Sequence, residues 1–434
     1  MSIIVIIINF FLTKTGAFEM EVKKNKVIAA ITLALSAISF PAYADFSFDC
    51  ETGLAGTFCK SQNSGKIALT MNGFVSGQVN MTDKLFARAE IAVKTDDILD
   101  GGIFEDTASG MSMNKLSLNY SFHAAGMTHV LSAFSGYEDS VGTDTYLRRM
   151  LGTNGVASPI TESHLGSDGI AIYPLKGSGI SYNARFSSVP AAAGAYIYKN
   201  DETSDETSQT NVDFRFATAL KYLTMDFAFG MGIPITRELS TGEKVFLLID
   251  RVNVHSGITL IIGNRNSTSL FVQGGFYNRE VESLSDLADT EMKDVFLLVE
   301  PRFKFNGSGI HFTFFNIPGT TLGKIVESSD GTPIFAYTPL TYMGMSDTLG
   351  GNITFISRET GAAGIRFGMH TMLTLEGRHL GDLGDKSELS DCIAIKMMPF
   401  VSFPVMGGTM TTTARIKATK FSESGITVGF KKSI

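Results

Sequence analysis

Residues 65–81, GKIALTMNGFVSGQVNM, alternate apolar and mostly polar side chains without a break. Successive side chains of a β-strand point to opposite faces, so this pattern predicts one extended strand with an apolar face and a polar face. Strands of soluble domains usually have about 5–6 residues, and this alternation lasts about three times as long. The length raises the question of which medium the apolar face contacts.

The same alternation recurs along the rest of the chain. Further repeats begin at Leu85, Leu116, Ile180, Val212, Leu223, Val295, Ile365, Ile393, Met410 and Ile426. Short links, such as 82–84 and 124–127, alternate with long ones, such as 136–177 and 318–349. One end of the predicted sheet therefore carries tight turns and the other end carries long loops. Between Val245 and Ile262 the alternation changes phase, which indicates a bulge or a hidden turn.

The composition agrees with a strand-rich chain. Its 434 residues include 44 Gly and 33 Phe but no Trp, and such abundance of Gly and aromatic residues favours turns and strands. Charged residues make up only 18% of the chain. The formal net charge of −7 leaves no basic stripe to meet phosphates, so nucleic acid is not an expected partner.

The segment that starts at Met20, MEVKKNKVIAAITLALSAISFPAYAD, has the three parts of a secretory signal peptide. Lysines precede an apolar run, and Ala42-Tyr43-Ala44 provides a small-residue cleavage site. The apolar run is shorter than the ~20 residues that a membrane helix needs. We therefore predict an upstream extension at 1–19, with Met20 as the true start, a signal peptide at 20–44 and one mature domain at 45–434.

Two architectures fit many long alternating strands. In a soluble β-sandwich the apolar faces pack on each other, whereas in a transmembrane barrel they meet lipid and the charged faces line a lumen. A tilted strand needs about 9–11 residues to cross a bilayer, and short turns alternating with long loops are typical of the two ends of such barrels. The pattern favours an all-β fold: a single transmembrane antiparallel up-and-down β-barrel of about 16–18 strands over residues 45–434.

On this pattern, residues 65–434 resemble the porin-like β-barrels of bacterial outer membranes. Members of that family commonly end in an aromatic-terminated strand, which the barrel-insertion machinery recognises. Here the last strand, SGITVGFKKSI, contains Phe430, and four residues follow it. Because Trp is absent, the interfacial girdle is expected to consist of Phe residues and of Tyr120, Tyr182, Tyr196, Tyr198 and Tyr222.

The resemblance implies a function as well as a fold. It implies localisation in the bacterial outer membrane, with membrane lipid and the barrel-insertion machinery as partners. It also implies a channel through which small hydrophilic solutes, including ions, diffuse passively, without a cofactor. The resemblance leaves open whether the protein forms a homo-oligomer.

If the lumen is aqueous, the polar faces of the strands line it. The charged pore-lining candidates are Arg88, Glu90, Arg185, Arg215, Asp226, Glu300, Arg302, Lys304, Arg366, Arg415 and Lys417. Basic side chains outnumber acidic ones in this set, which predicts a mild preference for anions. The alternative is that these charges are cross-strand ion pairs in a solvated wall, which reveal little about selectivity.

Porins often fold one long loop into the barrel, and the connection 136–177 is the candidate for such a constriction loop. Glu138, Asp139 and Asp144 would then face wall arginines, with Arg148 and Arg149 nearby. The alternative is an external loop, since long loops commonly form surfaces.

Cys50 and Cys59 lie nine residues apart in an exported segment, so they are candidates for a small disulfide loop in an oxidising compartment. A brief leading strand at DFSFD, followed by this loop outside, gives an even count of about eighteen strands. Cys392 falls in a strand pattern and is expected to be buried.

Catalytic motifs are absent from the sequence. There is no H-E-x-x-H, C-x-x-C or G-x-S-x-G, and no calcium loop. His129, His311 and His370 fall in strand patterns and are expected as lumen or packing residues. We therefore expect no enzyme, no cofactor and no metal. Two other functions remain open: a barrel whose loops act as a surface adhesin or antigen, and a soluble exported β protein.

Overall fold

The computed structural model describes residues 47–60, 66–95, 97–99, 110–163, 169–200, 207–238, 244–246, 252–281, 291–318, 338–342, 348–357, 364–384 and 392–433. The predicted upstream extension and signal peptide, and with them the choice between Met1 and Met20, lie outside these residues. Within them, no helix is both long enough and apolar enough to cross a membrane.

Most of the described chain is β-structure. The strands are β1 (Ser47–Lys60), β2 (Ile67–Asn80), β3 (Leu85–Lys94), β4 (Gly110–Ala124), β5 (Met127–Val141), β6 (Tyr173–Phe186), β7 (Ala191–Asn200), β8 (Thr207–Ala219), β9 (Leu223–Glu238), β10 (Lys244–Phe246), β11 (Val252–Gly263), β12 (Thr268–Val281), β13 (Phe296–Phe305), β14 (Ser308–Ile317), β15 (Thr348–Ile356), β16 (Arg366–Glu376), β17 (Ile393–Val405), β18 (Gly408–Lys417) and β19 (Gly425–Ser433).

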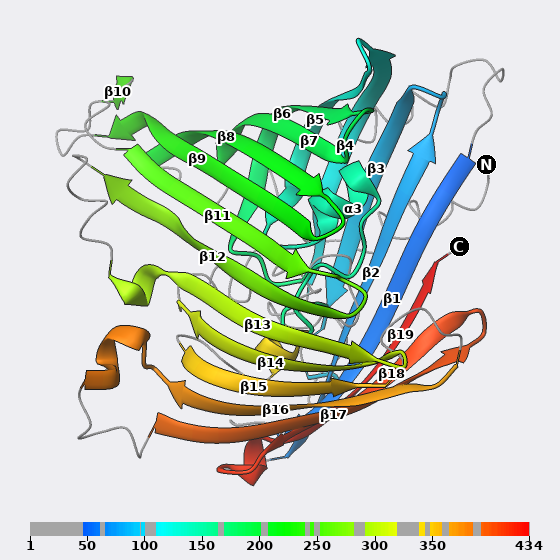
Figure 1. Cartoon of the computed structure of the whole chain (residues 1–434), viewed down its shortest axis with the longest axis vertical. Coiled ribbons are helices and arrows are strands. Elements are labelled where there is room, and N and C mark those ends of the chain that lie inside the picture. The colour runs from blue at the N-terminus through cyan, green and yellow to red at the C-terminus, as the bar shows by residue number, and fades with distance from the viewer. Residues whose placement is uncertain are drawn as a thin grey trace. The chain divides into compact units, whose positions relative to one another are not determined.

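All these strands join one antiparallel sheet that closes on itself (Figure 1). Strand β1 pairs with β2 on one side and with β19 on the other, so the two ends of the sheet meet. The short β10 pairs with the far end of β9, while β9 also pairs directly with β11, so eighteen strands form the ring. The predicted fold class, an all-β transmembrane up-and-down barrel, is confirmed.

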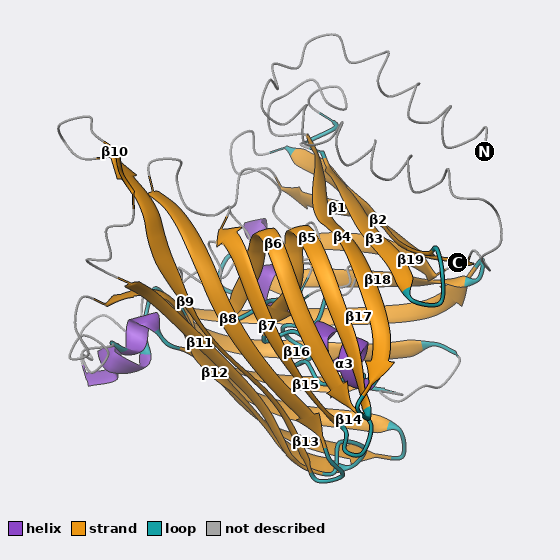
Figure 2. Ribbon diagram, turned by 90° about the horizontal axis from the view of Figure 1, so that it is seen from above, coloured by secondary structure: helices purple, strands orange, loops and turns teal. Residues whose placement is uncertain are grey.

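The two ends of the barrel differ as the sequence predicts. Tight turns such as 125–126, 306–307 and 406–407 lie at one end, together with the start of β1 and the end of β19. We call this the short-turn end; the opposite, long-loop end carries the connections such as 142–172 (Figure 2). Both explanations of the phase change near 245–262 apply, because β10 is a separate short strand and the β11–β12 pairing shifts register between Val254 and Ser256.

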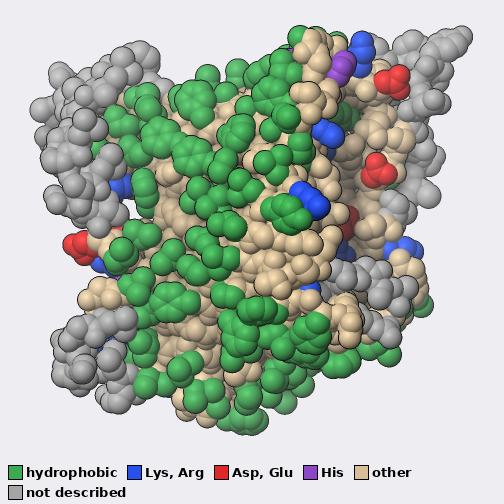
Figure 3. All heavy atoms as spheres, in the orientation of Figure 1, with side chains coloured by type: hydrophobic (Ala, Val, Ile, Leu, Met, Phe, Trp, Pro, Cys, Tyr) green, Lys and Arg blue, Asp and Glu red, His purple; other side chains and the backbone are tan. Residues whose placement is uncertain are grey.

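The alternation gives the ring two chemically different faces. On β6, Ile180 and Tyr182 are exposed on the outer face, whereas Ser181 and Asn183 are buried on the inner face. Apolar side chains cover most of the visible outer surface, with few charged groups among them (Figure 3). Apolar surface kept out of water contributes roughly 25 cal/mol per Å², and a closed ring leaves no unpaired strand edge in lipid.

The hydrophobic core lies inside the ring. The connection 142–172, between β5 and β6, contains helix α3 (Thr145–Leu151), which lies within the barrel (Figures 1 and 2). Leu147, Ile160 and Ile172 of this segment are buried with inward-facing side chains of the wall, so the segment fills part of the lumen.

Two wall glycines make this close approach possible. Gly257 of β11 and Gly275 of β12 are paired partners. A Cβ atom at Gly257 would lie 2.7 Å from Val141 Cγ1, and one at Gly275 would lie 2.7 Å from Ile172 Cγ2. Both distances are too short for a side chain, so glycine at these positions lets Val141, at the end of β5, and Ile172 of the inward segment touch β11 and β12.

The strand β1 overturns the predicted disulfide. Residues 47–60 form one continuous strand of 14 residues rather than a brief strand and a loop. At ~3.3 Å per residue, Cys50 and Cys59 are about 30 Å apart, far beyond the ~7 Å between Cα atoms that a disulfide allows. Both thiols are free, and Cys392, predicted to be buried, is half-buried just before β17.

The predicted aromatic girdle is partly wrong. Tyr120, Tyr182 and Tyr222 are exposed on the outer face, but Tyr196 and Tyr198 are buried inside the barrel. The small side chains of β7 explain the difference, because its outer face carries Ala193, Ala195 and Ile197 while its inner face presents the two large rings to the segment 142–172.

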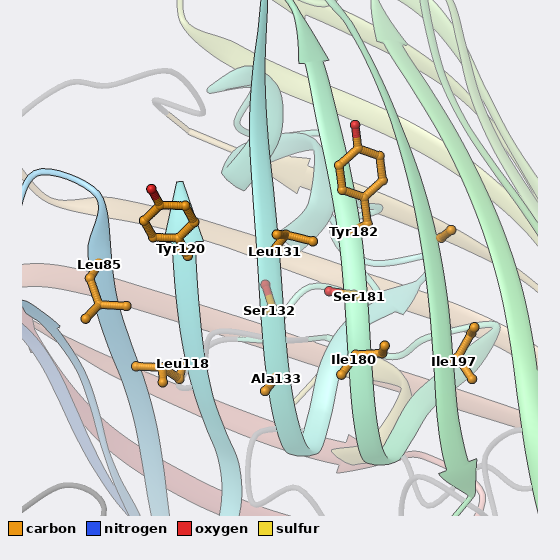
Figure 4. A pocket seen from close by; sticks show the side chains of 11 residues that line it. Leu85, Leu118, Tyr120, Leu131, Ser132, Ala133, Ile180, Ser181, Tyr182 and Ile197 are labelled. Carbon is orange, nitrogen blue, oxygen red and sulfur yellow. The ribbon is translucent and has the colours of Figure 1, made fainter. Parts of the chain in front are cut away.

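His129 is a packing residue of the outer face. Its ring stacks on Phe122 and Tyr182, with centroids 4.8 and 5.9 Å away, and its Nδ1 lies 2.7 Å from the Tyr182 hydroxyl. Beside it, an apolar groove of about 400 Å³ crosses β3 to β7, lined by side chains such as Leu118 and Ile180 (Figure 4). This groove is part of the lipid-facing surface.

Candidate channel lumen

The inner wall from β5 to β14 is covered by the segment 142–172, and we call it the packed wall. Helix α3 contacts β5, β7 and β8, and it ends at Gly152, whose φ of 67° is the left-handed conformation that glycine adopts easily. On the neighbouring β12, Gln273 donates from Nε2 to the Gly142 carbonyl oxygen at 2.7 Å. The segment is therefore attached to the wall where it leaves β5.

An ion-pair network holds α3 against the packed wall. Arg215 of β8 makes a bidentate pair with Asp226 of β9, at 2.8 Å from Nε and 2.6 Å from Nη2. Its third nitrogen donates to the Asp139 carbonyl oxygen, and its guanidinium lies 4.3 Å from the ring centroid of Tyr146 in α3. Arg149 of α3 pairs with the Asp139 carboxylate, to which Tyr196 also donates at 2.9 Å. Bidentate pairs and added hydrogen bonds are what make charges tolerable in such buried positions.

A second network holds the far part of the segment. Glu300 of β13 accepts hydrogen bonds from Ser158 at 2.5 Å and Thr313 at 2.6 Å, and its other oxygen pairs with Arg302 at 2.7 Å. Arg302 in turn donates to the carbonyl oxygens of Val156 and Ala157. These contacts fix residues 156–158 to β13, about half the ring away from β5.

Further polar groups fill the space between the two networks. His255 of β11 lies 2.8 Å from Asp213 of β8, between Nε2 and Oδ1, and the Tyr173 hydroxyl donates to the same oxygen at 3.4 Å. A second connection also reaches the segment, since the Leu340 N–H donates to the Ile160 carbonyl oxygen at 3.1 Å. The packed wall is therefore a hydrogen-bonded interior rather than a water-lined surface.

The remaining inner wall, formed by β16–β19 and β1–β3, is the open wall. A cavity of about 390 Å³ lies between it and residues 159–163 of the inward segment. Arg366, Ser402, Thr411 and Lys431 line the cavity from the wall. Toward the short-turn end of this wall, inner side chains such as Ser402 and Thr411 are only half-buried, whereas nearer the long-loop end others, such as Met372 and Lys396, are buried.

The predicted pore-lining residues divide between these two walls. Arg215, Asp226, Glu300 and Arg302 lie on the packed wall and are buried in ion pairs. On the open wall lie Arg88, Glu90, Arg366, Arg415 and Lys417, of which Glu90 and Lys417 are buried. Arg185 and Lys304 lie near the short-turn end of their strands, exposed and half-buried respectively.

The predicted constriction residues are arranged only partly as expected: Glu138 and Asp139 attract the wall arginines Arg88 and Arg215, but they do so from the wall itself. Glu138 and Asp139 belong to the wall strand β5, and the Asp139 carboxylate pairs with Arg149 of the inward segment itself. Glu138 is buried with the Lys115 Nζ at 3.9 Å. Asp144 precedes α3 as its N-cap residue without a side-chain cap, and Arg148 is exposed.

Sequence reasoning missed two buried groups of the lumen, Tyr146 and His255. Both are almost fully buried on the inner side, as are Asp213 and Lys396, whose inward positions the strand patterns predict. Lys396 pairs with Glu376 at 2.5 Å. The inward position of His255 follows from the strand alternation of β11, whereas Tyr146 belongs to helix α3 of the inward segment, which leaves no periodic signal. Among the described residues, no three His, Cys, Asp or Glu side chains gather closely enough to hold a metal ion.

Solved structures of outer-membrane proteins resemble the chain. Wzi of Escherichia coli, described as an outer membrane protein involved in group 1 capsule assembly and a carbohydrate-binding β-barrel, is 12% identical, with 96% of this chain and 89% of Wzi covered and a TM-score of 0.45. OccK8 (OprE) of Pseudomonas aeruginosa is 9% identical, with 90% and 98% covered and a TM-score of 0.47. A triple mutant of the Rhodopseudomonas blastica porin is 9% identical, with 90% and 100% covered and a TM-score of 0.41.

No protein-family model and no curated protein sequence matches the chain. The identities and TM-scores of the solved structures are too low to carry an argument about function. The geometry itself is decisive: a closed ring with an apolar outer face and a polar interior satisfies every strand edge in hydrocarbon. The chain is a β-barrel of the bacterial outer membrane, with eighteen strands in its ring.

Proposed function

We propose that the barrel is a channel for the passive diffusion of small hydrophilic solutes, which pass along the open wall. The observation that carries this proposal is the cavity between the open wall and residues 159–163, which is lined by polar side chains such as Ser402 and Thr411. A segment that covers one wall and leaves the other wet narrows a lumen without sealing it. Neither a cofactor nor a catalytic step is part of the proposal.

A mild preference for anions is the second part of this proposal. The open wall presents Arg88, Arg366, Lys396, Arg415, Lys417 and Lys431 inward, against Glu51, Glu90 and Glu376 on the same wall and Glu162 of the inward segment. A surplus of fixed positive charge in a narrow aqueous space raises the local concentration of anions, and salt weakens the effect. The buried pairs of the packed wall add little to this selectivity because their charges are compensated.

Planar-bilayer recordings of the refolded protein test both parts. We expect discrete conductance steps, and a reversal potential in a KCl gradient that shows chloride more permeant than potassium. Replacing Arg366 and Arg415 by Gln should reduce the chloride preference, whereas Lys293→Gln, fully exposed outside the barrel wall, should leave it unchanged. Potassium preference in the unmodified protein would contradict the charge argument.

The second candidate function is a surface adhesin or antigen. The filled half of the lumen favours it, because a barrel that is largely packed inside serves well as a rigid support for loops. Conductance separates the two functions: a barrel that inserts into the bilayer, is heat-modifiable on gels and yet passes no current is not a channel. Homo-oligomer formation and recognition by the barrel-insertion machinery remain proposals that these recordings do not address.

A further inference from the structure

The cavity on the open wall is lined by an acid and a base from different segments. Glu162 projects from the inward segment and its side chain is exposed, while Arg366 is the first residue of β16 in the wall. The Arg366 Nε is buried, yet it makes no hydrogen bond within the part of the chain that the structure describes. A buried donor without an acceptor costs about 1–3 kcal/mol, so this group is suited to meet a ligand oxygen.

The other charge at the cavity is already compensated. Lys431 of β19 pairs with Glu51 of β1 at 2.7 Å, between Nζ and Oε1. The guanidinium of Arg366, whose Nε has no hydrogen-bond acceptor among the described residues, is thus the cation available to a solute, and the Glu162 carboxylate, which Arg366 attracts electrostatically, is the matching anion. A simple anion would meet repulsion from Glu162, and a neutral sugar would leave both charges without a partner.

The cavity also has an apolar side. The Phe400 ring stacks on His370 with centroids 5.4 Å apart, and the Arg366 guanidinium lies 5.9 Å from the same ring centroid. Pro159 and Ile356 add apolar surface to the lining. Apolar walls with a few convergent polar groups, in a volume of about 300–1,000 Å³, are typical of small-molecule sites.

We propose that this cavity is a binding site for zwitterionic α-amino acids with an aliphatic side chain. The carboxylate meets Arg366, the ammonium group meets Glu162, and the side chain packs on Phe400. This inference rests on the proposed channel function and names the solute class that the channel favours.

Current block in planar bilayers tests the site with three matched probes. Leucine carries both charges, 4-methylpentanoate lacks the ammonium group, and 3-methylbutylamine lacks the carboxylate. We expect leucine to interrupt the KCl current at a concentration about tenfold lower than either analogue, as expected when one charge-assisted hydrogen bond is lost. Both Glu162→Gln and Arg366→Gln should remove this advantage, whereas Glu291→Gln, which is fully exposed, should retain it.

The outcomes separate the two proposals. Conductance with equal block by all three probes, or an advantage that persists in both cavity variants, overturns the amino-acid site and leaves the channel intact. A barrel without conductance overturns both proposals. Glu162 and Arg366 face a cavity rather than the packed interior, so we expect their variants to fold. Heat-modifiable gel mobility verifies this before the recordings.

Discussion

The packed wall and the open wall have the same strand alternation, yet inner side chains beside the cavity of the open wall are less buried than those of the packed wall. Both present polar side chains inward from antiparallel strands of similar length. On the packed wall, Asn183, Gln273 and Glu300 are completely buried, because the segment 142–172 excludes water from them. On the open wall, side chains such as Ser402 and Thr411 remain half-buried beside the cavity. The alternation therefore decides which way a side chain points, and the inward segment decides whether it meets water.

The largest expected effect is the loss of stability that follows when a buried ion pair of the packed wall loses one partner. Arg302→Met removes one partner of the Arg302–Glu300 pair and leaves the Glu300 carboxylate buried without its main countercharge. We expect the free energy of unfolding to fall by about 3–5 kcal/mol. Denaturant titration in lipid vesicles measures this, with Lys304→Met, half-buried near the turn of the same strand, as the control that should change little. Equal losses in both variants would contradict a specific role for the buried pair.

A second change tests the contact between the segment and the wall. Gly275→Val places a side chain where a Cβ would already lie 2.7 Å from Ile172 Cγ2 and still closer to the Ser256 carbonyl oxygen of β11. Overpacking of this kind costs about 1–3 kcal/mol and should push the segment away from β12. In the matched variant Gly351→Val, the nearest atom to the new Cβ is 3.8 Å away, so ordinary contact suffices. Vesicle unfolding should show a clear loss in the first variant and a smaller one in the second.

A third change removes one hydroxyl, which lies within hydrogen-bond distance of two acceptors, Asp139 Oδ2 at 2.9 Å and Asn183 Oδ1 at 3.0 Å. Tyr196→Phe deletes the hydroxyl that donates to Asp139, while the ring remains packed against the segment. The expected cost is about 1–2 kcal/mol because the bond goes to a charged acceptor. Tyr222→Phe, on the exposed outer face, should cost close to nothing. Equal free energies of unfolding for Tyr196→Phe and Tyr222→Phe would contradict a stabilising role for the Tyr196 hydroxyl in the Asp139 network.

The smallest expected effect concerns the open wall and depends on pH. Although the Glu162 side chain is exposed to the cavity, the surrounding protein limits its hydration and raises the pKa of its carboxyl; Arg366 opposes this shift, as do Lys431 and Arg302, while Asp144 adds to it. As the pH falls, Glu162 therefore loses its negative charge at a higher pH than an ordinary carboxyl of pKa ~4.3. Chloride preference should rise over that interval in the unmodified protein and stay flat in Glu162→Gln. A rise of equal size in the variant would place the titrating group elsewhere.

The outer surface was almost fully predictable from the sequence. Alternating positions such as Ile180 and Tyr182 point outward as expected, because period-two alternation is a local property of an extended chain. Strand number and closure followed from segment length and from the alternation of short and long links. The predicted disulfide failed because the sequence does not reveal that β1 continues through Cys50 and Cys59.

The interior was predictable only in part. Arg215, Asp226, Glu300 and Arg302 were expected inward, but their pairing with one another and with the segment depends on ring closure and on contacts between residues far apart in sequence. The inward position of Tyr196 was missed because aromatic residues in barrel strands ordinarily mark the membrane interface. Only the packing of a second element against β7 reverses that expectation.

The most direct test of the two-wall account is the reactivity of single cysteines in a variant that lacks Cys50, Cys59 and Cys392. A water-soluble, membrane-impermeant thiol reagent is added to vesicles that contain the barrel with a cysteine at Thr411 of the open wall, at Ser181 of the packed wall or at Ile353 of the outer face. The account predicts rapid modification at 411 and protection at 181 and 353. A fluorescent group attached at each of these positions should be quenched by brominated lipid at 353 alone. Equal reactivity at 411 and 181 would contradict it, because the lumen would then be uniformly wet or uniformly closed.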